Sequence, residues 1–201
     1  MDLENMLSRR TVSLKPSGIR KFFNVANEME GVIALGVGEP DFKTPYSVRQ
    51  AGIENLQQGK TSYSANAGLI DLRRAICDYL QRKFLLEYDK NTEVVVTVGG
   101  SEAIDLAIRA FVNPGDEVLI PEPSFVCYAP IVTLTSGVPV TIETREEDHF
   151  RLTPEQLEAA ITPRTKMLIL PYPNNPTGAV VRWEQLEGSA EVLRRHDIVV
   201  L

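Results

Sequence analysis

The second half of the chain alternates between two kinds of segment. Runs rich in branched apolar residues recur from residue 93 onwards, namely EVVVTV, EVLIPE, VPVTIET, KMLIL and DIVVL. Between them lie segments with helical spacing, namely SEAIDLAIRAF, SFVCYAPIVTL, LTPEQLEAAI and RWEQLEGSAEVLRR. Strands that alternate with helices of about 10–15 residues predict a parallel sheet with right-handed crossovers. Because the strands are continuous Val/Ile/Leu runs, we expect helices on both faces of the sheet.

The first half of the chain predicts two helices after a polar arm, over residues 46–58 and 69–87. Six apolar residues of the second helix recur at helical spacing and predict core packing: Leu69, Leu72, Ile76, Tyr79, Leu80 and Phe84. In LTPEQLEAAI, Thr153 is the expected N-cap and Pro154 lies in the first turn. The predicted fold class is α/β, a three-layer α/β/α arrangement with a mostly parallel sheet and an N-terminal arm.

The predicted domains are the arm, residues 1–30, and one incomplete α/β domain, residues 31–201. DIVVL reads as a central buried strand, yet the sequence ends on it at Leu201. Chain ends usually lie at the surface. We therefore expect the chain to be the front portion of a longer polypeptide.

Composition excludes several functional classes. With 43% hydrophobic and 24% charged residues the chain is typical of a soluble globular protein, and its net charge of -6 argues against nucleic acid as a partner. No apolar run approaches the ~20 residues that span a bilayer, so no membrane partner is expected. Cys77 and Cys127 have no metal or redox spacing and are expected to be free, buried thiols in a cytoplasmic protein. No metal site is predicted.

The first of three unusual loops, VGGSEAI, follows the run at 93–98. In open α/β sheets, ligands bind outside the carboxyl ends of the strands. Gly100 and Ser101 stand at a predicted helix start, where free N–H groups, the helix dipole and a hydroxyl favour an anion. The loop lacks the lysine of a P-loop, so it suits a single phosphate. The alternative is an ordinary turn with Ser101 as N-cap.

The other two loops, PEPSFVCY and PYPNNPTG, follow the runs at 117–122 and 166–170. Phe125 could stack on a flat ring or pack in the core. Pro176 favours an extended Asn175 and can aim its amide at the crevice, while Gly178 lets the chain turn back. A phosphate seat, a stacking face and an amide donor together describe a site for a small aromatic phosphate.

In this combination the sequence resembles the class I/II aminotransferases, pyridoxal 5'-phosphate (PLP) enzymes of fold type I. Six matching segments occur in the family's order: SGIRKF, GVGEPDFKTP, TSYSANAGLIDLR, VTVGGSEAIDLA, PGDEVLIPEPSFVCY and LPYPNNPTG. Among subgroups, the bacterial aromatic and N-acetyl-diaminopimelate aminotransferases look most similar. The resemblance implies that residues 31–201 are part of the large PLP-binding domain.

The resemblance also implies roles for individual residues. Gly38 would bind the substrate carboxylate through its backbone. Tyr63 would reach the cofactor phosphate of the neighbouring subunit, which implies a homodimer. The remaining cofactor contacts would be the phosphate held by Gly100, Ser101 and the backbone N–H of Glu102, the pyridine ring stacked on Phe125, and the ring 3'-oxygen bonded to Asn175.

Three functional residues of the family have no counterpart in these 201 residues. They are the acidic partner of the pyridine nitrogen, the lysine that forms the Schiff base and the arginine that binds the substrate carboxylate. In the family all three follow the strand that corresponds to DIVVL. No lysine present lies in a similar motif, so no catalytic residue is assigned. Without that lysine there is no base for the proton shift of transamination, and the chain alone is expected to be inactive.

The leading hypothesis is therefore an N-terminal portion of an aminotransferase, which transfers an amino group between an amino acid and a 2-oxo acid. A PLP-dependent β-lyase or synthase of the same superfamily is one alternative. A non-enzymatic ligand-binding domain is another. A dinucleotide-binding domain built on GVGEPDF is disfavoured because the third glycine of the fingerprint is absent.

Overall fold

The computed structural model describes most of the chain and divides it into two compact units. One unit comprises residues 1–16 and 98–201, and the other comprises residues 17–97. We refer to them as the sheet unit and the helical unit. The described residues are 6–15, 18, 25, 29–33, 38 and 40–201.

The sheet unit contains a four-stranded sheet in the order β2-β1-β3-β4. All three neighbouring pairs are parallel, which confirms the predicted sheet type. β1 lies between β2 and β3, and it pairs with β2 residue for residue from Glu117–Val138 to Glu122–Glu143. The strands are β1 (Glu117–Glu122), β2 (Val138–Glu143), β3 (Thr165–Leu168) and β4 (Val199–Val200).

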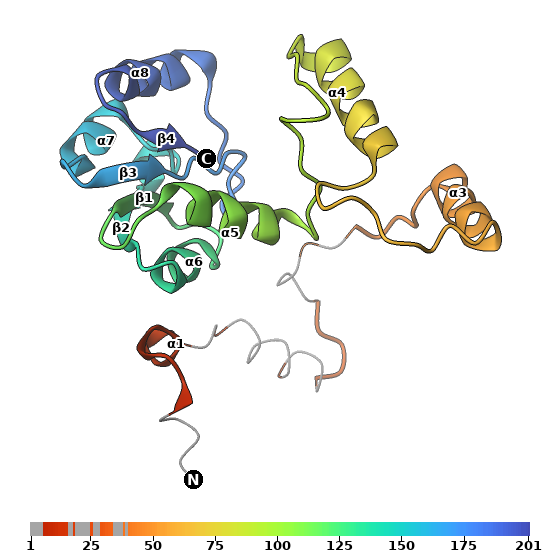
Figure 1. Cartoon of the computed structure of the whole chain (residues 1–201). Helices are drawn as coiled ribbons and strands as arrows, with labels where there is room; N and C mark the ends of the chain where they lie inside the picture. Colours follow the sequence, from red (N-terminus) through yellow and green to blue (C-terminus); the bar gives the residue numbers. More distant parts are fainter. Residues whose placement is uncertain (1–5, 16–17, 19–24, 26–28, 34–37, 39) are drawn as a thin grey trace. The chain divides into compact units, whose positions relative to one another are not determined.

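Helices cover both faces of this sheet (Figure 1). Alternate residues of β1 enter two separate cores, as the period of two in a strand requires. Val118 and Ile120 pack on one face with Ile108 of α5 (Gly100–Phe111) and Val132 of α6 (Tyr128–Leu134). Leu119 packs on the other face with residues of α7 (Pro154–Ala160) and α8 (Trp183–Arg194). The three-layer α/β/α prediction is confirmed.

Two local devices fix helices of the sheet unit. Thr153 caps α7 as predicted, because its hydroxyl accepts from the Gln156 N–H at 3.2 Å and Gln156 Oε1 accepts from the Thr153 N–H at 3.0 Å. The short helix α1 (Arg9–Ser13) carries Arg10, which donates to the Leu134 carbonyl at 3.0 Å and to Ser136 Oγ at 2.5 Å. Arg10 thereby satisfies a carbonyl at the end of α6.

The helical unit contains the two predicted helices, α3 (Tyr46–Gln57) and α4 (Ile70–Phe84). The expected core packing of the α4 stripe is wrong for its larger members, since Leu69 is 62% and Phe84 53% exposed. The covered side of α4 instead presents Arg73 and Cys77. Arg73 Nη1 donates to the Lys90 carbonyl at 2.7 Å, so a polar loop closes over this helix.

The run EVVVTV is not a strand in the structure, so that prediction is wrong. Residues 94–97 belong to no helix or strand, and Val95 and Val98 are 61% and 91% exposed. Among the described residues no strand runs alongside the segment, and a strand requires a hydrogen-bonded neighbour. Its Val96 N–H instead donates to the Ala67 carbonyl at 3.0 Å.

The helix predicted from Ser124 begins at Tyr128. A turn occupies the residues before it, in which the Tyr128 N–H donates to the Phe125 carbonyl at 3.3 Å. No helix in the described part of the chain is long and apolar enough to cross a membrane.

Candidate functional site

The loop before α5 presents an open helix N-terminus. Gly99 has φ 83°, in the left-handed region that favours glycine, and no side chain caps the helix. The first N–H groups of a helix, here those of Gly100, Ser101 and Glu102, have no partner within the helix. Neither Gly99 nor Gly100 would bring a Cβ within 4 Å of another group, so the space on the Cβ side of these two residues is open.

The Glu102 side chain forms a hydrogen bond with the backbone that precedes the helix. Its carboxylate accepts a hydrogen bond from the Val98 N–H. A carboxylate in the first turn is also stabilised by the helix dipole. With the side chain engaged in this way, the backbone N–H of Glu102 is the group that can face an anion.

The structure brings Ser101 next to the PEPSFVCY loop. The Ser101 hydroxyl lies close enough to the Cys127 thiol to influence its pKa. Burial raises the pKa of this thiol, while the Ser101 hydroxyl opposes the rise. Both cysteines are free as predicted, but Cys127 is half-buried rather than buried, because it lies at this loop junction.

Phe125 lies at the same junction. Its ring is half-buried and meets Tyr128 edge to face, with 5.8 Å between ring centroids and 82° between ring planes. Burial raises the pKa of Tyr128, and the neighbouring Cys127 acts in the same direction. Ser101, Phe125, Cys127 and Tyr128 thus form one group that joins two of the three predicted loops.

The third loop, PYPNNPTG, contains one buried and one exposed asparagine. Asn174 is 7% exposed, and its Oδ1 accepts from the N–H and hydroxyl of Thr177 at 3.2 and 2.9 Å. Asn175 is exposed and, among the described residues, its amide has no hydrogen-bond partner. Gly178 has φ 71° and donates to the Asn174 carbonyl at 2.9 Å, which confirms its predicted place in the turn.

Sequence reasoning did not predict the structural role of Asn174. The doubled asparagine before a proline was the available signal, since an Asn that bonds its own backbone nearby is typical of a turn. The two asparagines have different roles: Asn174 stabilises the turn, and Asn175 is available to a ligand.

The second and third loops leave the sheet at the same edge. β1 and β3 are parallel neighbours, and the Ile169 N–H donates to the Leu119 carbonyl at 3.0 Å just before the third loop begins. Gly38 and Tyr63 belong to the helical unit, where both are exposed. Within the sheet unit, Ser101 and Phe125 belong to one group of side chains, and Asn175 lies on the loop that follows the neighbouring strand.

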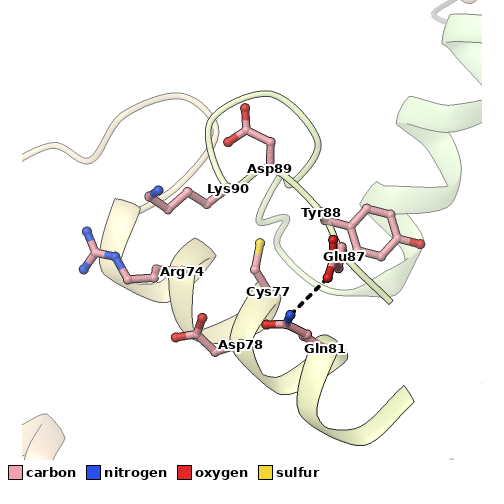
Figure 2. A pocket seen from close by; sticks show the side chains of 8 residues that line it. All are labelled: Arg74, Cys77, Asp78, Gln81, Glu87, Tyr88, Asp89 and Lys90. Atoms are coloured by element: carbon pink, nitrogen blue, oxygen red, sulfur yellow. Dashed lines mark hydrogen bonds between the residues drawn. The ribbon is translucent and has the colours of Figure 1, made fainter. Parts of the chain in front are cut away.

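A separate cavity of about 340 Å³ lies in the helical unit, between α4 and the loop that follows it (Figure 2). Gln81 Nε2 donates to Glu87 Oε1 at 3.2 Å across its wall. No predicted site residue lines it, and no group of three or more metal-ligating side chains occurs among the described residues. Its lining mixes both charges: Arg74, Asp78, Glu87, Asp89 and Lys90, with Cys77 and Tyr88.

Comparisons with known proteins identify the family of the chain. A family model described as "Aminotransferase class I and II" matches residues 30–201. The chain is 51% identical to "Putative aminotransferase YugH" of Bacillus subtilis over 99% of its length, and 43% identical to "Aromatic-amino-acid aminotransferase 2" of Thermococcus litoralis over 97%. It covers 52% and 50% of those proteins, so the chain spans about half the length of the curated relatives it matches.

A solved structure shows the same fold. The aspartate aminotransferase of Rhizobium meliloti aligns with a TM-score of 0.90 at 40% identity. The alignment covers 96% of this chain and 50% of that one.

Proposed function

Since the chain belongs to the class I and II aminotransferase family, we propose that it is the amino-terminal part of a PLP-dependent aminotransferase. The whole protein would transfer an amino group between an amino acid and a 2-oxo acid. The observation that carries this proposal is the uncapped N-terminus of α5, which lies beside an aromatic turn through the contact of Ser101 with Cys127.

The residues present fit a phosphate ester. The helix dipole and free N–H groups at the start of a twelve-residue helix favour an anion. No side chain or backbone group crowds the Cβ side of Gly99 or Gly100. Gly100, Ser101 and Glu102 would hold the phosphate through their N–H groups, and Ser101 adds a hydroxyl.

The residues present also fit a flat ring. Phe125 is only half-buried, so part of its ring can contact a ligand. The free Asn175 amide can donate a hydrogen bond to the ring 3'-oxygen, from a turn that Asn174 already holds. When bound, PLP supplies the electron sink of the reaction. The residues of this chain bind and orient it.

The remaining roles depend on more than the sheet unit. Gly38 would bind the substrate carboxylate, and Tyr63 would reach the cofactor phosphate of the partner subunit in a homodimer. We assign residues 1–30 to an arm and residues 31–201 to the cofactor-binding domain. Cys77 and Cys127 form no disulfide, which supports a reducing compartment, the cytoplasm.

Cofactor binding is tested best with pyridoxamine 5'-phosphate. It has the ring, 3'-oxygen and phosphate of PLP but no aldehyde that could react with surface lysines. Isothermal titration of the 201-residue chain should show saturable binding. Because hydrogen bonds to charged groups contribute about 1.5–3 kcal/mol, Ser101→Ala should raise the Kd at least about tenfold. Asn175→Ala should raise it less.

Ser47→Ala, at an exposed serine of α3, is the matched control and should leave the Kd unchanged. No saturation at millimolar ligand, or equal weakening by Ser47→Ala and Ser101→Ala, would contradict the proposed site.

Catalysis is a separate test. No lysine of the chain lies in a segment like the family's cofactor-binding lysine, so the 201 residues alone should not convert an aromatic amino acid and 2-oxoglutarate. Turnover by the purified chain that exceeds the uncatalysed rate and saturates with substrate would show that this assignment is wrong.

A further inference from the structure

A cavity of about 530 Å³ lies in the sheet unit, apart from the proposed cofactor site. Residues 146–151 form one wall and residues 177–182 form the other. None of Gly100, Ser101, Glu102, Phe125 or Asn175 lines it. Its volume is in the range of small-molecule sites.

The cavity walls are held by specific contacts. The Tyr172 hydroxyl donates to the Phe150 carbonyl at 3.1 Å and accepts from the Leu152 N–H at 2.8 Å. Burial raises the pKa of Tyr172, so the donating proton stays in place. His149 and Phe150 have φ 54° and 55°, a left-handed backbone that side chains rarely adopt. These contacts give the first wall one defined shape.

Arg151 connects the two walls. Its Nε donates to the Val180 carbonyl at 2.8 Å, so the guanidinium is fixed against the cavity and its two Nη groups remain to bind a ligand. Arg182 lines the opposite wall. Within the described residues, neither arginine forms an ion pair.

The charge of the lining is positive. Arg151 and Arg182 carry two permanent positive charges, and Glu146 is the carboxylate among the lining residues. His149 adds a polar ring, while Phe150 and Val180 add apolar surface. An anion that displaces water here would meet two guanidinium groups and one opposing charge.

We propose that this cavity binds a small organic anion with carboxylate or phosphate groups. A guanidinium presents planar pairs of N–H donors that match both groups. Arg151 and Arg182 would bind the anionic groups from opposite walls, and the Phe150 and Val180 side chains would contact the carbon skeleton. The site does not depend on the proposed cofactor function.

Isothermal titration of the 201-residue chain with succinate and, separately, with inorganic phosphate tests the proposal. We expect saturable binding of at least one of the two. Arg182→Gln should weaken it at least about tenfold, because charge-assisted hydrogen bonds are lost. Arg194→Gln makes the same charge change at the far end of α8 and should leave the Kd unchanged. Binding of succinate alone identifies carboxylates, and binding of phosphate alone that Arg182→Gln weakens identifies phosphoryl groups.

Arg151→Gln is the second variant and should weaken binding as Arg182→Gln does. Ser101→Ala separates the two sites, because it should weaken pyridoxamine 5'-phosphate binding and leave succinate binding unchanged. The proposal is overturned if neither anion saturates at millimolar concentration. It is also overturned if Arg194→Gln weakens binding as much as Arg182→Gln, or if Ser101→Ala weakens succinate binding.

Discussion

The sheet unit and the helical unit of this chain both contain helices but differ in what those helices bury. Apart from Cys77, every buried hydrophobic residue among those described lies in the sheet unit. α3 has no buried residue, and α4 buries Arg73 and Cys77. A helical pattern is thus sufficient for a helix to form here, whereas the buried core of the described residues lies on the two faces of the sheet. Helix stability in proteins comes mostly from such packing.

The largest expected effect comes from replacing one leucine of each unit by alanine. Leu119 of β1 is fully buried, whereas Leu72 of α4 is 45% exposed. Leu119→Ala should lower the free energy of unfolding by about 2–5 kcal/mol, because it leaves a cavity in the core. Leu72→Ala should lower it by less than about 1 kcal/mol. Urea denaturation followed by circular dichroism measures both.

Equal losses for the two leucine variants would break the comparison. They would mean that the apolar side chains of the α4 stripe are packed in a core in solution, as the sequence predicted.

Two glycines give effects of opposite sign. A Cβ at Gly137 would lie 2.8 Å from Val112 Cγ1 and 3.0 Å from Val132 Cγ1, so Gly137→Ala should destabilise by about 1–3 kcal/mol. Gly52 lies inside α3, where an added Cβ would meet no group within 4 Å, and Gly52→Ala should stabilise by about 0.5–1 kcal/mol. Thermal unfolding of both variants decides the signs. A destabilising Gly52→Ala would reveal packing against α3.

Changes at helix caps should have smaller effects on stability, of opposite sign in the two units. Thr153→Ala removes the capping box of α7 and should cost about 1 kcal/mol. α4 has no side-chain cap, since Leu69 stands at that position. Leu69→Ser should therefore increase helicity and stabilise the helical unit by about 0.5 kcal/mol. Circular dichroism and denaturation measure both, and a loss of helicity in Leu69→Ser would refute the second expectation.

The smallest effect concerns acid stability of the sheet unit. Thr162 Oγ1 donates to Glu117 at 2.5 Å and Arg164 Nε donates at 3.0 Å, and these bonds hold the pKa of Glu117 below its ordinary value of 4.5. A depressed folded-state pKa gives stability that is present above 4.5 and is lost as the pH falls through the lower folded value. Glu117→Gln should reduce this loss in the free energy of unfolding at acid pH. Glu184 is an exposed carboxylate of α8, and Glu184→Gln should leave the loss unchanged. An unchanged acid limb in Glu117→Gln would exclude the mechanism.

Local patterns were sufficient to predict much of the sheet unit. EVLIPE is a strand over the expected residues, and Thr153 is the cap, because β-branched runs and capping signals act within a few residues. The open helix start at Ser101 follows from the same kind of local signal. The contact of Ser101 with Cys127 could not be predicted, since it depends on how α5 and α6 pack.

The failures share a physical cause. EVVVTV has a strand-like sequence, but a strand exists only when a neighbour supplies hydrogen bonds, and no described segment does so. The α4 stripe has the period of a buried helix face, but burial needs an apolar partner. In each case the segment has the pattern of the predicted structure, but its own sequence does not say which segment lies next to it.

The central claim is that the N-terminus of α5 holds the cofactor phosphate. The most direct test is a titration of the ¹⁵N-labelled chain with pyridoxamine 5'-phosphate, followed through amide chemical shifts. We predict saturable shifts that are largest at the N–H groups of Gly100, Ser101 and Glu102, with a further shift at the Asn175 side-chain amide. Saturable shifts that leave these four groups unchanged, whether or not they gather around Arg151 and Arg182, would contradict the claim.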